Sequence, residues 1–344
     1  MMPPSPMRLG MIGFGRIVEL IHLPVVKRLK GIEVAGVYDI TPERLRLAER
    51  RGFHTYTDLD ELLSTPLDAV LVATPHQSHY SIAALALRAG KHVILEKPVT
   101  LTSEEAIQLK QLAQSSGKVI TVFHNRRYDS DFELVKQVIA GGELGPLLSV
   151  SRRHHSFGSG APFGVKSFYP NWRNEAYYGG GALLDWGVHL IDQLLQLQAG
   201  KFRRITATLQ NMRWLQGDVE DYVQATICTD QDIMVSLDIN FGSYANTPMW
   251  VVGGEAGTLE VISDREATIY LKDSKPRTIE LKPSLLDGPC TIYASFLAHL
   301  QEGKPLAITI DEAVETMRVV DAIRQSAAQR KEVLYGDYVL SPSS

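Results

Sequence analysis

The chain has 344 residues, 35 of them Lys or Arg and 39 Asp or Glu, so its formal net charge at pH 7 is −4. At about 150 residues per domain, this length predicts two domains. A nearly balanced charge disfavours binding to nucleic acid or to an anionic membrane, because both select a basic surface. Two cysteines cannot form a disulfide framework, and no apolar stretch reaches the roughly 18 residues of a membrane span. We therefore expect a cytoplasmic protein with no nucleic-acid or membrane partner.

The first 124 residues alternate between strand and helix patterns. Five short apolar runs predict strands, at residues 8–12, 33–38, 69–73, 92–95 and 119–123. Four helices are predicted between them, at residues 17–30, from Pro42 onward with Thr41 as N-cap, 78–89 and 103–116. Strands that alternate with helices at this spacing predict βαβ units, and therefore a doubly wound parallel sheet over residues 1–124.

From residue 125 to residue 344 the pattern is dominated by strands. Apolar and more polar residues alternate in three segments, at residues 205–209, 223–227 and 233–241. Helices are predicted near residues 131–140, 182–196, 293–301 and 310–329. A period of two fits a mostly antiparallel sheet with one face on helices. The sequence therefore predicts an α/β protein whose second domain has a large open sheet, with its C-terminal helices able to pack back on the first domain.

A glycine-rich turn follows the first predicted strand. In the segment Gly13-Phe14-Gly15-Arg16-Ile17-Val18, Gly13 would form the tight turn, and Gly15 would let the backbone approach a pyrophosphate at the helix N-terminus. Val18 stands where the fingerprint has its third glycine, which serves helix–strand packing. The position of the turn within a βαβ unit favours dinucleotide binding. The alternative is a doubly wound domain without a nucleotide.

Asp39 ends the second predicted strand, 24 residues after Gly15. A carboxylate at this position accepts hydrogen bonds from a ribose diol and repels a 2′-phosphate, which predicts NAD over NADP. Arg44 is close enough in sequence to soften that preference, so NADP stays open. The alternative is a turn aspartate that caps the helix after Thr41.

Three further residues suggest acid–base chemistry. Lys97, in Glu96-Lys97-Pro98, follows a buried strand at the edge of the sheet where doubly wound folds bind ligands. Asp185 and His189 are four residues apart on a predicted helix and so share one face. A carboxylate beside an imidazole is a natural acid–base pair, although an isolated pair of this kind is more often a structural hydrogen bond.

Together these segments resemble the Gfo/Idh/MocA oxidoreductase family. The motifs that carry the resemblance are Gly13-Phe14-Gly15, Thr74-Pro75 with His79, Glu96-Lys97-Pro98, residues 124–129, Trp172-Arg173 and residues 181–189. Residues 125–129 are most similar to the scyllo-inositol dehydrogenase branch. Asp39 departs from the basic or hydroxyl pattern of the NADP-using members of that branch.

The resemblance implies an N-terminal Rossmann domain and hydride transfer between NAD(P) and a secondary alcohol of a sugar or cyclitol. The implied catalytic residues are Lys97, Asp185 and His189, with Asp185 orienting substrate or His189. The implied cofactor-binding residues are Gly13, Phe14, Gly15, Arg16, Ile17, Asp39, Thr74, Pro75, His79, Glu96, Lys97, Trp172 and Arg173. The implied substrate-binding residues are Lys97, Asn125, Arg127, Tyr128, His155, Asp185 and His189. It also implies a homodimer or homotetramer built through the second sheet.

We expect His189 to be the base, since the unperturbed pKa of imidazole is about 6.5, and Lys97 to stabilise the developing alkoxide. Lys97 as the base stays open. No metal is expected, because His154 and His155 would point to opposite faces of one strand. The loop at Gly158-Ser159-Gly160 is expected near the active site.

Two other functions remain open. One is an NAD-dependent glycosidase that acts by transient oxidation. The other is a dinucleotide-sensing regulator without catalysis, which the presence of Lys97, Asp185 and His189 disfavours.

Overall fold

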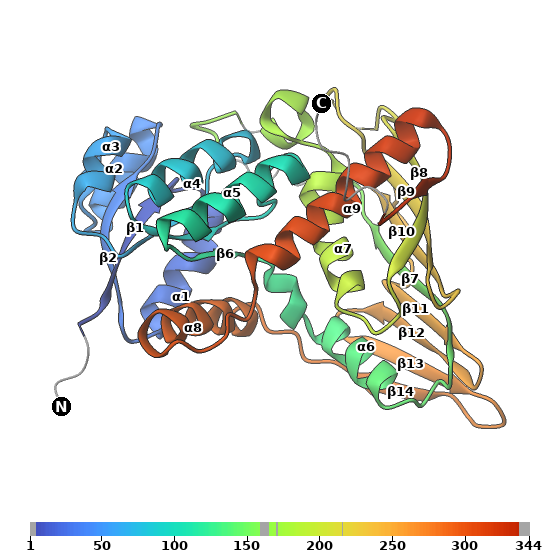
Figure 1. The fold of residues 1–344 in the computed structure, drawn as a ribbon. Coiled ribbons are helices and arrows are strands. Elements are labelled where there is room, and N and C mark those ends of the chain that lie inside the picture. The colour runs from blue at the N-terminus through green and yellow to red at the C-terminus, as the bar shows by residue number, and fades with distance from the viewer. Residues whose placement is uncertain (1–4, 159–164, 170, 215, 337–344) are drawn as a thin grey trace.

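The computed structural model describes residues 5–158, 165–169, 171–214 and 216–336 (Figure 1). Ser159 and Gly160 of the expected active-site loop lie outside these residues. The first sheet has six parallel strands in the order β3-β2-β1-β4-β5-β6. These strands are β1 (Met7–Ile12), β2 (Ile32–Tyr38), β3 (Thr55–Tyr56), β4 (Ala69–Val72), β5 (His92–Leu95) and β6 (Ile120–Val122). This order is that of the Rossmann fold, as predicted.

The second sheet has nine strands in the order β14-β13-β12-β11-β7-β10-β9-β8-β15. All neighbours are antiparallel except β7 and β10, which are parallel. The first five strands in sequence are β7 (Leu147–His155), β8 (Phe202–Gln210), β9 (Tyr222–Thr229), β10 (Met234–Asn240) and β11 (Trp250–Gly254). They are followed by β12 (Gly257–Ser263), β13 (Glu266–Leu271), β14 (Arg277–Glu280) and β15 (Val333–Leu334). The prediction of a mostly antiparallel sheet is confirmed.

Helices cover the first sheet and one face of the second. In the first half of the chain these are α1 (Leu23–Arg28), α2 (Pro42–Arg50), α3 (Leu59–Ser64), α4 (His79–Arg88) and α5 (Ser103–Ser116). The second half contributes α6 (Ser130–Ala140), α7 (Val188–Leu195), α8 (Asp287–Glu302) and α9 (Ile310–Gln329). In Figure 1, α6, α7 and α9 lie on the side of the second sheet that faces the first domain.

The last two helices return to the first domain. Ile292, Tyr293 and Phe296 of α8 are buried in the same cluster as the side chains of β1 and α1. The red helix α9 in Figure 1 packs against α5 on one side and against α7 and β8 on the other. The helix therefore joins the two sheets into one packed body.

Two helices contain a π-helical turn that the apolar pattern did not predict. The helix predicted at 17–30 consists of the π-helical turn η1 (Val18–His22) followed by α1. The helix predicted at 182–196 consists of η7 (Leu183–Gly187) followed by α7. Val18 is fully buried, so the missing third glycine does not prevent packing of the first helix.

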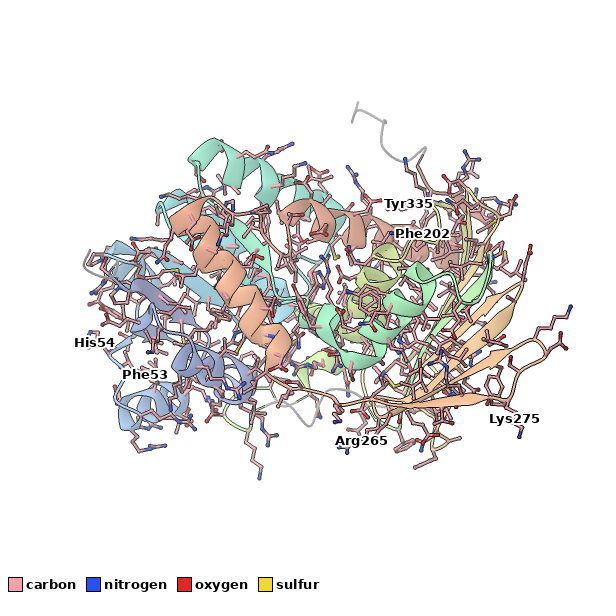
Figure 2. All side chains as sticks on the ribbon, turned by 90° about the horizontal axis from the view of Figure 1, so that it is seen from below. Phe53, His54, Phe202, Arg265, Lys275 and Tyr335 are labelled. Atoms are coloured by element: carbon pink, nitrogen blue, oxygen red, sulfur yellow. The ribbon has the colours of Figure 1, made fainter. Side chains whose placement is uncertain are left out.

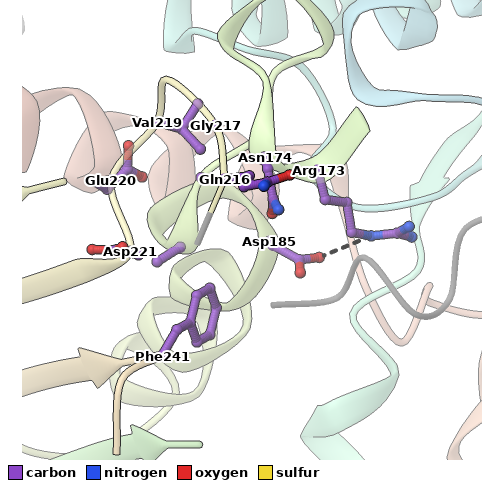
Figure 3. Close-up of a pocket in the computed structure, with 11 residues that line it drawn as sticks. Arg173, Asn174, Asp185, Gln216, Gly217, Val219, Glu220, Asp221 and Phe241 are labelled. Atoms are coloured by element: carbon purple, nitrogen blue, oxygen red, sulfur yellow. Dashed lines mark ion pairs between the residues drawn. The ribbon is translucent and has the colours of Figure 1, made fainter. Parts of the chain in front are cut away.

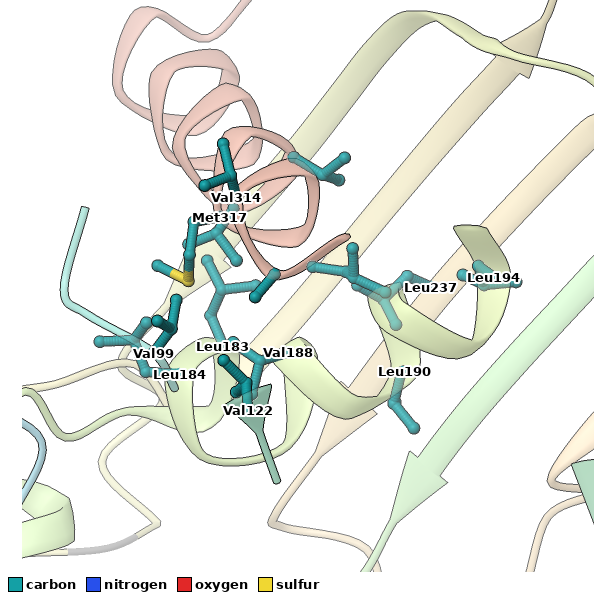
Figure 4. Close-up of a cluster of buried hydrophobic side chains, with 14 of the residues drawn as sticks. Val99, Val122, Leu183, Leu184, Val188, Leu190, Leu194, Leu237, Val314 and Met317 are labelled. Carbon is teal, nitrogen blue, oxygen red and sulfur yellow. The ribbon is translucent and has the colours of Figure 1, made fainter. Parts of the chain in front are cut away.

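A continuous apolar core connects the domains. Figure 4 shows Val99 and Val122 of the first domain beside Leu183, Leu184 and Val188, with Val314 and Met317 of α9 packed above them. Figure 2 shows the full set of side chains, with Phe53 and His54 at one end of the molecule and Lys275, between β13 and β14, at the other. Within the described residues, no helix is long and apolar enough to cross a membrane.

Candidate active site

A cavity of about 460 Å³ lies where the strands of the first sheet end. This is the edge at which doubly wound sheets bind their ligands. Its walls include the turn after β1, the ends of β2, β4 and β5, and the helix of η7 and α7. The predicted site residues that line it are Gly13, Gly15, Arg16, Ile17, Asp39, Thr74, Pro75, Glu96, Lys97, Asn125, Trp172, Arg173, Asp185 and His189.

The glycine turn has the geometry that close approach of a nucleotide requires. Gly13 has φ +88°, and a Cβ there would lie 2.5 Å from the carbonyl oxygen of Ala73. A Cβ on Gly15 would meet nothing within 4 Å, so the backbone faces open space in the cavity. Phe14 turns its side chain inward against Phe53, with ring centroids 6.0 Å apart. These features fit a dinucleotide with its pyrophosphate beside Gly15.

Asp39 is fixed by the turn that it faces. Its Oδ2 accepts a hydrogen bond from the Phe14 N–H at 2.7 Å, and its Oδ1 accepts from the N–H and the hydroxyl of Thr41 at 2.8 and 2.6 Å. Thr41 is the N-cap residue of α2 and Pro42 its first helical residue, as predicted, but the Thr41 hydroxyl donates to the Asp39 carboxylate and makes no capping hydrogen bond. Asp39 thus holds the turn, and it lines the cavity with a carboxylate that can accept further hydrogen bonds.

Lys97 and Asp185 meet across the two domains. The Lys97 Nζ donates to the backbone carbonyl of Asp185 at 2.7 Å and to its Oδ1 at 3.1 Å. The Nε of Arg173 lies 3.5 Å from the same Oδ1, as the dashed line in Figure 3 marks. The expectation that Asp185 orients His189 is not supported, because its partners are these two cations.

The charges around Asp185 keep it ionised. Burial by itself raises the pKa of the carboxyl, but the Lys97 and Arg173 cations together hold that pKa well below its usual range. Asp185 is therefore a carboxylate throughout the physiological pH range, and it fixes the position of the Lys97 ammonium.

His189 lies one turn after Asp185 and is 6% exposed. Burial, with the nearby Lys97 and Arg126, lowers the pKa of its imidazole well below 6.5. Its Nδ1 is buried without a hydrogen-bond partner among the described residues. The imidazole of His189 is therefore neutral at neutral pH. It can accept a proton, and it lies near the ammonium group of Lys97.

Two predicted cofactor residues, His79 and Glu96, make buried hydrogen bonds next to the cavity. The ring nitrogens of His79 lie 2.7 Å from the Pro98 carbonyl and 2.9 Å from the Thr74 carbonyl, and the side chain is fully buried. His79 therefore fixes the two loops and does not line the cavity. Glu96 lines the cavity and has its Oε1 3.0 Å from the Nε2 of His22.

Three predicted substrate residues are not on the cavity walls. Arg127 is buried, and its guanidinium pairs with Asp192 at 2.6 and 2.7 Å. Tyr128 packs against α8, where a Cβ on Gly288 would lie 2.7 Å from its Cβ. His155 pairs with Asp238, 3.1 Å away, on the neighbouring strand. The structure thus gives all three a packing or pairing role away from this cavity, and their assignment to substrate stays a prediction.

An aromatic stack at the cavity was not predicted as a unit. The Arg126 guanidinium lies 4.3 Å from the ring centre of Trp186, and His154 stacks on Trp186 with centroids 3.4 Å apart. Arg126 and Trp186 line the cavity, as do His76, Gln77 and Phe168. The position of Trp186 between Asp185 and His189 was the available sequence signal.

Glu220 supports the helix that carries Asp185 and His189, and sequence reasoning missed it. Its carbonyl accepts from the Ala182 N–H at 3.0 Å, and its Oε1 accepts from the Leu183 N–H at 2.9 Å. At Gly181, with φ +109°, a Cβ would lie 2.4 Å from Oε1. Figure 3 shows Glu220 beside a second cavity of about 10 Å³, which has room for about one water.

No group of three or more potential metal ligands occurs within the residues described.

Two family models match the chain. One, described as the oxidoreductase family with an NAD-binding Rossmann fold, matches residues 7–124. The other, described as the GFO/IDH/MocA C-terminal domain, matches residues 132–260.

Similar proteins include dehydrogenases of sugars and cyclitols. The chain is 25% identical to the scyllo-inositol 2-dehydrogenase (NADP(+)) IolW of Bacillus subtilis, over 95% of both chains. It is 29% identical to the D-glucoside 3-dehydrogenase of Escherichia coli, over 56% of this chain and 55% of that protein. An NAD-binding protein from Listeria innocua has the same fold, with a TM-score of 0.85 and 28% identity, over 96% of this chain and 97% of that one.

Proposed function

Because the chain belongs to the Gfo/Idh/MocA oxidoreductase family and has its NAD-binding Rossmann domain, we propose that it is a dehydrogenase of a secondary alcohol in a sugar or cyclitol. The observation that carries the proposal is the contact of Lys97 with Asp185, next to His189, in the cavity that the Gly13–Gly15 turn also lines. A relative that oxidises an inositol and another that oxidises a glucoside support this substrate class.

Each residue of this group has a distinct part in alcohol oxidation. NAD, held beside the Gly13–Gly15 turn and Asp39, would supply the acceptor for the hydride of the alcohol carbon. The neutral His189 imidazole accepts the hydroxyl proton, which its lowered pKa leaves it free to do at neutral pH. The Lys97 ammonium donates a hydrogen bond to the oxygen as negative charge develops there. Asp185, held by Lys97 and Arg173, fixes the direction of that ammonium.

The cofactor preference follows from Asp39. Its carboxylate lines the cavity at the end of β2, where it accepts from a ribose diol and repels a 2′-phosphate. We therefore propose NAD as the preferred cofactor, with IolW, named for NADP(+), as a relative that differs.

The proposal is tested by incubating the purified protein with inositols, aldoses, methyl glycosides and sugar acids, each with NAD+ or NADP+. Reduced nicotinamide should appear with at least one polyol or sugar, and faster with NAD+. Release of an aglycone without net reduction would support the glycosidase instead. Cofactor binding without turnover of any member of the panel would contradict the dehydrogenase proposal.

A further inference from the structure

We propose that Glu19 is a second determinant of the preference for NAD, because it holds Arg44 in an ion pair and so keeps that guanidinium from a 2′-phosphate. The inference rests on the cofactor preference proposed above. It concerns a residue that lies outside the nucleotide fingerprint, on the π-helical turn η1.

Arg44 stands where an NADP-binding arginine is expected. It lies in the first turn of α2, five residues after Asp39, and it lines the same cavity. An arginine near the end of β2 commonly accommodates the 2′-phosphate of NADP. The position of Arg44 alone would therefore favour NADP.

The contacts of Arg44 explain why its position does not lead to a preference for NADP. Its Nε donates to the carbonyl oxygen of Phe14 at 2.5 Å, and its Nη2 donates to the Oε2 of Glu19 at 2.5 Å. The other oxygen of Glu19 pairs with the guanidinium of Arg51. Both oxygens of Glu19 are thus occupied by cations, and its side chain is only 17% exposed.

The charge balance explains the effect on a phosphate. The guanidinium groups of Arg44 and Arg51 both pair with the Glu19 carboxylate, which offsets part of their positive charge. A 2′-phosphate would have to draw Arg44 away and leave the mostly buried Glu19 carboxylate without one of its two partners, which is costly. It would also stand near a second carboxylate, Asp39. A ribose hydroxyl requires neither change.

The test compares Glu19→Ala with Glu43→Ala. Glu43 also pairs with an arginine, Arg46, but that pair is more than half exposed. Both variants remove one negative charge from the same region, and only Glu19→Ala releases Arg44. Dissociation constants for NAD+, NADP+ and 2′,5′-ADP are measured by titration calorimetry in the absence of substrate.

Glu19→Ala should bind NADP+ and 2′,5′-ADP about tenfold more tightly than the unmodified protein, the scale of one charged hydrogen bond. Its affinity for NAD+ should stay within about twofold, and Glu43→Ala should change none of the three constants by more. Adding Arg44→Ala to Glu19→Ala should abolish the gain. Glu19→Gln, which keeps the shape of the side chain and removes its charge, should give a smaller gain in the same direction.

Two results would overturn the proposal in different ways. If the unmodified protein prefers NAD+ but neither Glu19 variant gains affinity for NADP+, or if Glu43→Ala gains equally, then Glu19 is not a determinant. If the unmodified protein binds NADP+ as tightly as NAD+, the proposed preference itself is wrong.

Discussion

At the scale of single residues, the site keeps its charges paired and its imidazoles neutral. Lys97 is held by the carboxylate and the carbonyl of Asp185, and Arg173 adds a second cation to that carboxylate. Burial lowers the pKa of His76 and of His189, and the positive charge of Lys97 lowers both pKa values further. In the proposed reaction, the cation that faces the reacting oxygen would therefore also keep the neighbouring base unprotonated.

The roles of His189 and Lys97 are separated by pH–rate profiles of His189→Ala and Lys97→Met. The pKa of His189 lies below 6.5, so the unmodified enzyme should lose kcat/KM only at acidic pH, as the ring becomes protonated. His189→Ala should lower kcat by about 100-fold or more and lose this acidic limb. Lys97→Met should be slow but keep the limb. His299→Ala, outside the cavity, is the control. Near-normal turnover of His189→Ala with the limb intact would assign the base elsewhere.

The partners of these residues were not predictable from local sequence. Lys97, Asp185 and His189 were identified because each follows a strand or shares a helix face. That Asp185 faces Lys97 rather than His189 depends on how the two sheets are oriented. The same holds for Arg127, whose partners Asp192 and Glu312 come from two other elements.

At the scale of elements, agreement with the sequence is best where a helix carries its own end signals. Residues 103–116 and 310–329 were predicted with the observed bounds, and Thr102 and Thr309 accept from the third helical N–H. The helix α8 begins six residues before the predicted start, because Gly288 and Pro289 in its first turn suggest a loop. The π-helical turns η1 and η7 were not predicted, because one such turn hardly changes the spacing of apolar residues along a helix.

A buried hydrogen-bond chain ties α8 to the cavity. The Tyr293 hydroxyl lies 2.8 Å from the Nδ1 of His22, whose Nε2 lies 3.0 Å from Glu96. Burial raises the pKa of Tyr293 well above 10, so its hydroxyl stays protonated and can donate to His22. The Glu96 Oε2 accepts from the Lys97 N–H at 3.1 Å, so the chain ends at the backbone of Lys97.

Tyr293→Phe removes one hydroxyl from this chain and keeps the buried ring. Because the Nδ1 of His22 loses its partner in an interior site, the free energy of unfolding should fall by about 1–3 kcal/mol. Chemical denaturation followed by fluorescence measures the change. Tyr177→Phe, at a 77% exposed position, should have no effect. A loss for Tyr293→Phe no larger than that of the control would show that the chain does not stabilise the fold.

At the scale of the whole molecule, the second sheet has one face without a helix among the described residues (Figure 1). Alternation along β9 and β10 sends Val223, Ala225 and Val235 inward, while Thr226 and Met234 point to the other side. Met234 is 46% exposed. We propose that this face forms a two-fold interface in a homodimer or homotetramer, because a C2 interface uses the same patch on both copies.

Met234→Lys combined with Thr226→Lys tests the interface. A two-fold arrangement places the added charges of both copies on the same buried patch, so association should weaken and the mass should shift toward the monomer. Light scattering after size exclusion at micromolar concentration measures this. Leu285→Lys, at a 70% exposed position between β14 and α8, should leave the mass unchanged. An unmodified protein that is already monomeric would contradict the proposal.

The position of α9 has a consequence for how the protein folds. One face of this helix completes the core of the first domain at α5, and the other completes the second at α7 and β8. The helix follows both halves in the sequence. It is thus required by each of them, including the half that is synthesised first. Neither half can complete its native packing before α9 is present, so the cavity between them forms only with that helix in place. We infer that the two halves complete their folding together, as one cooperative step that includes α9.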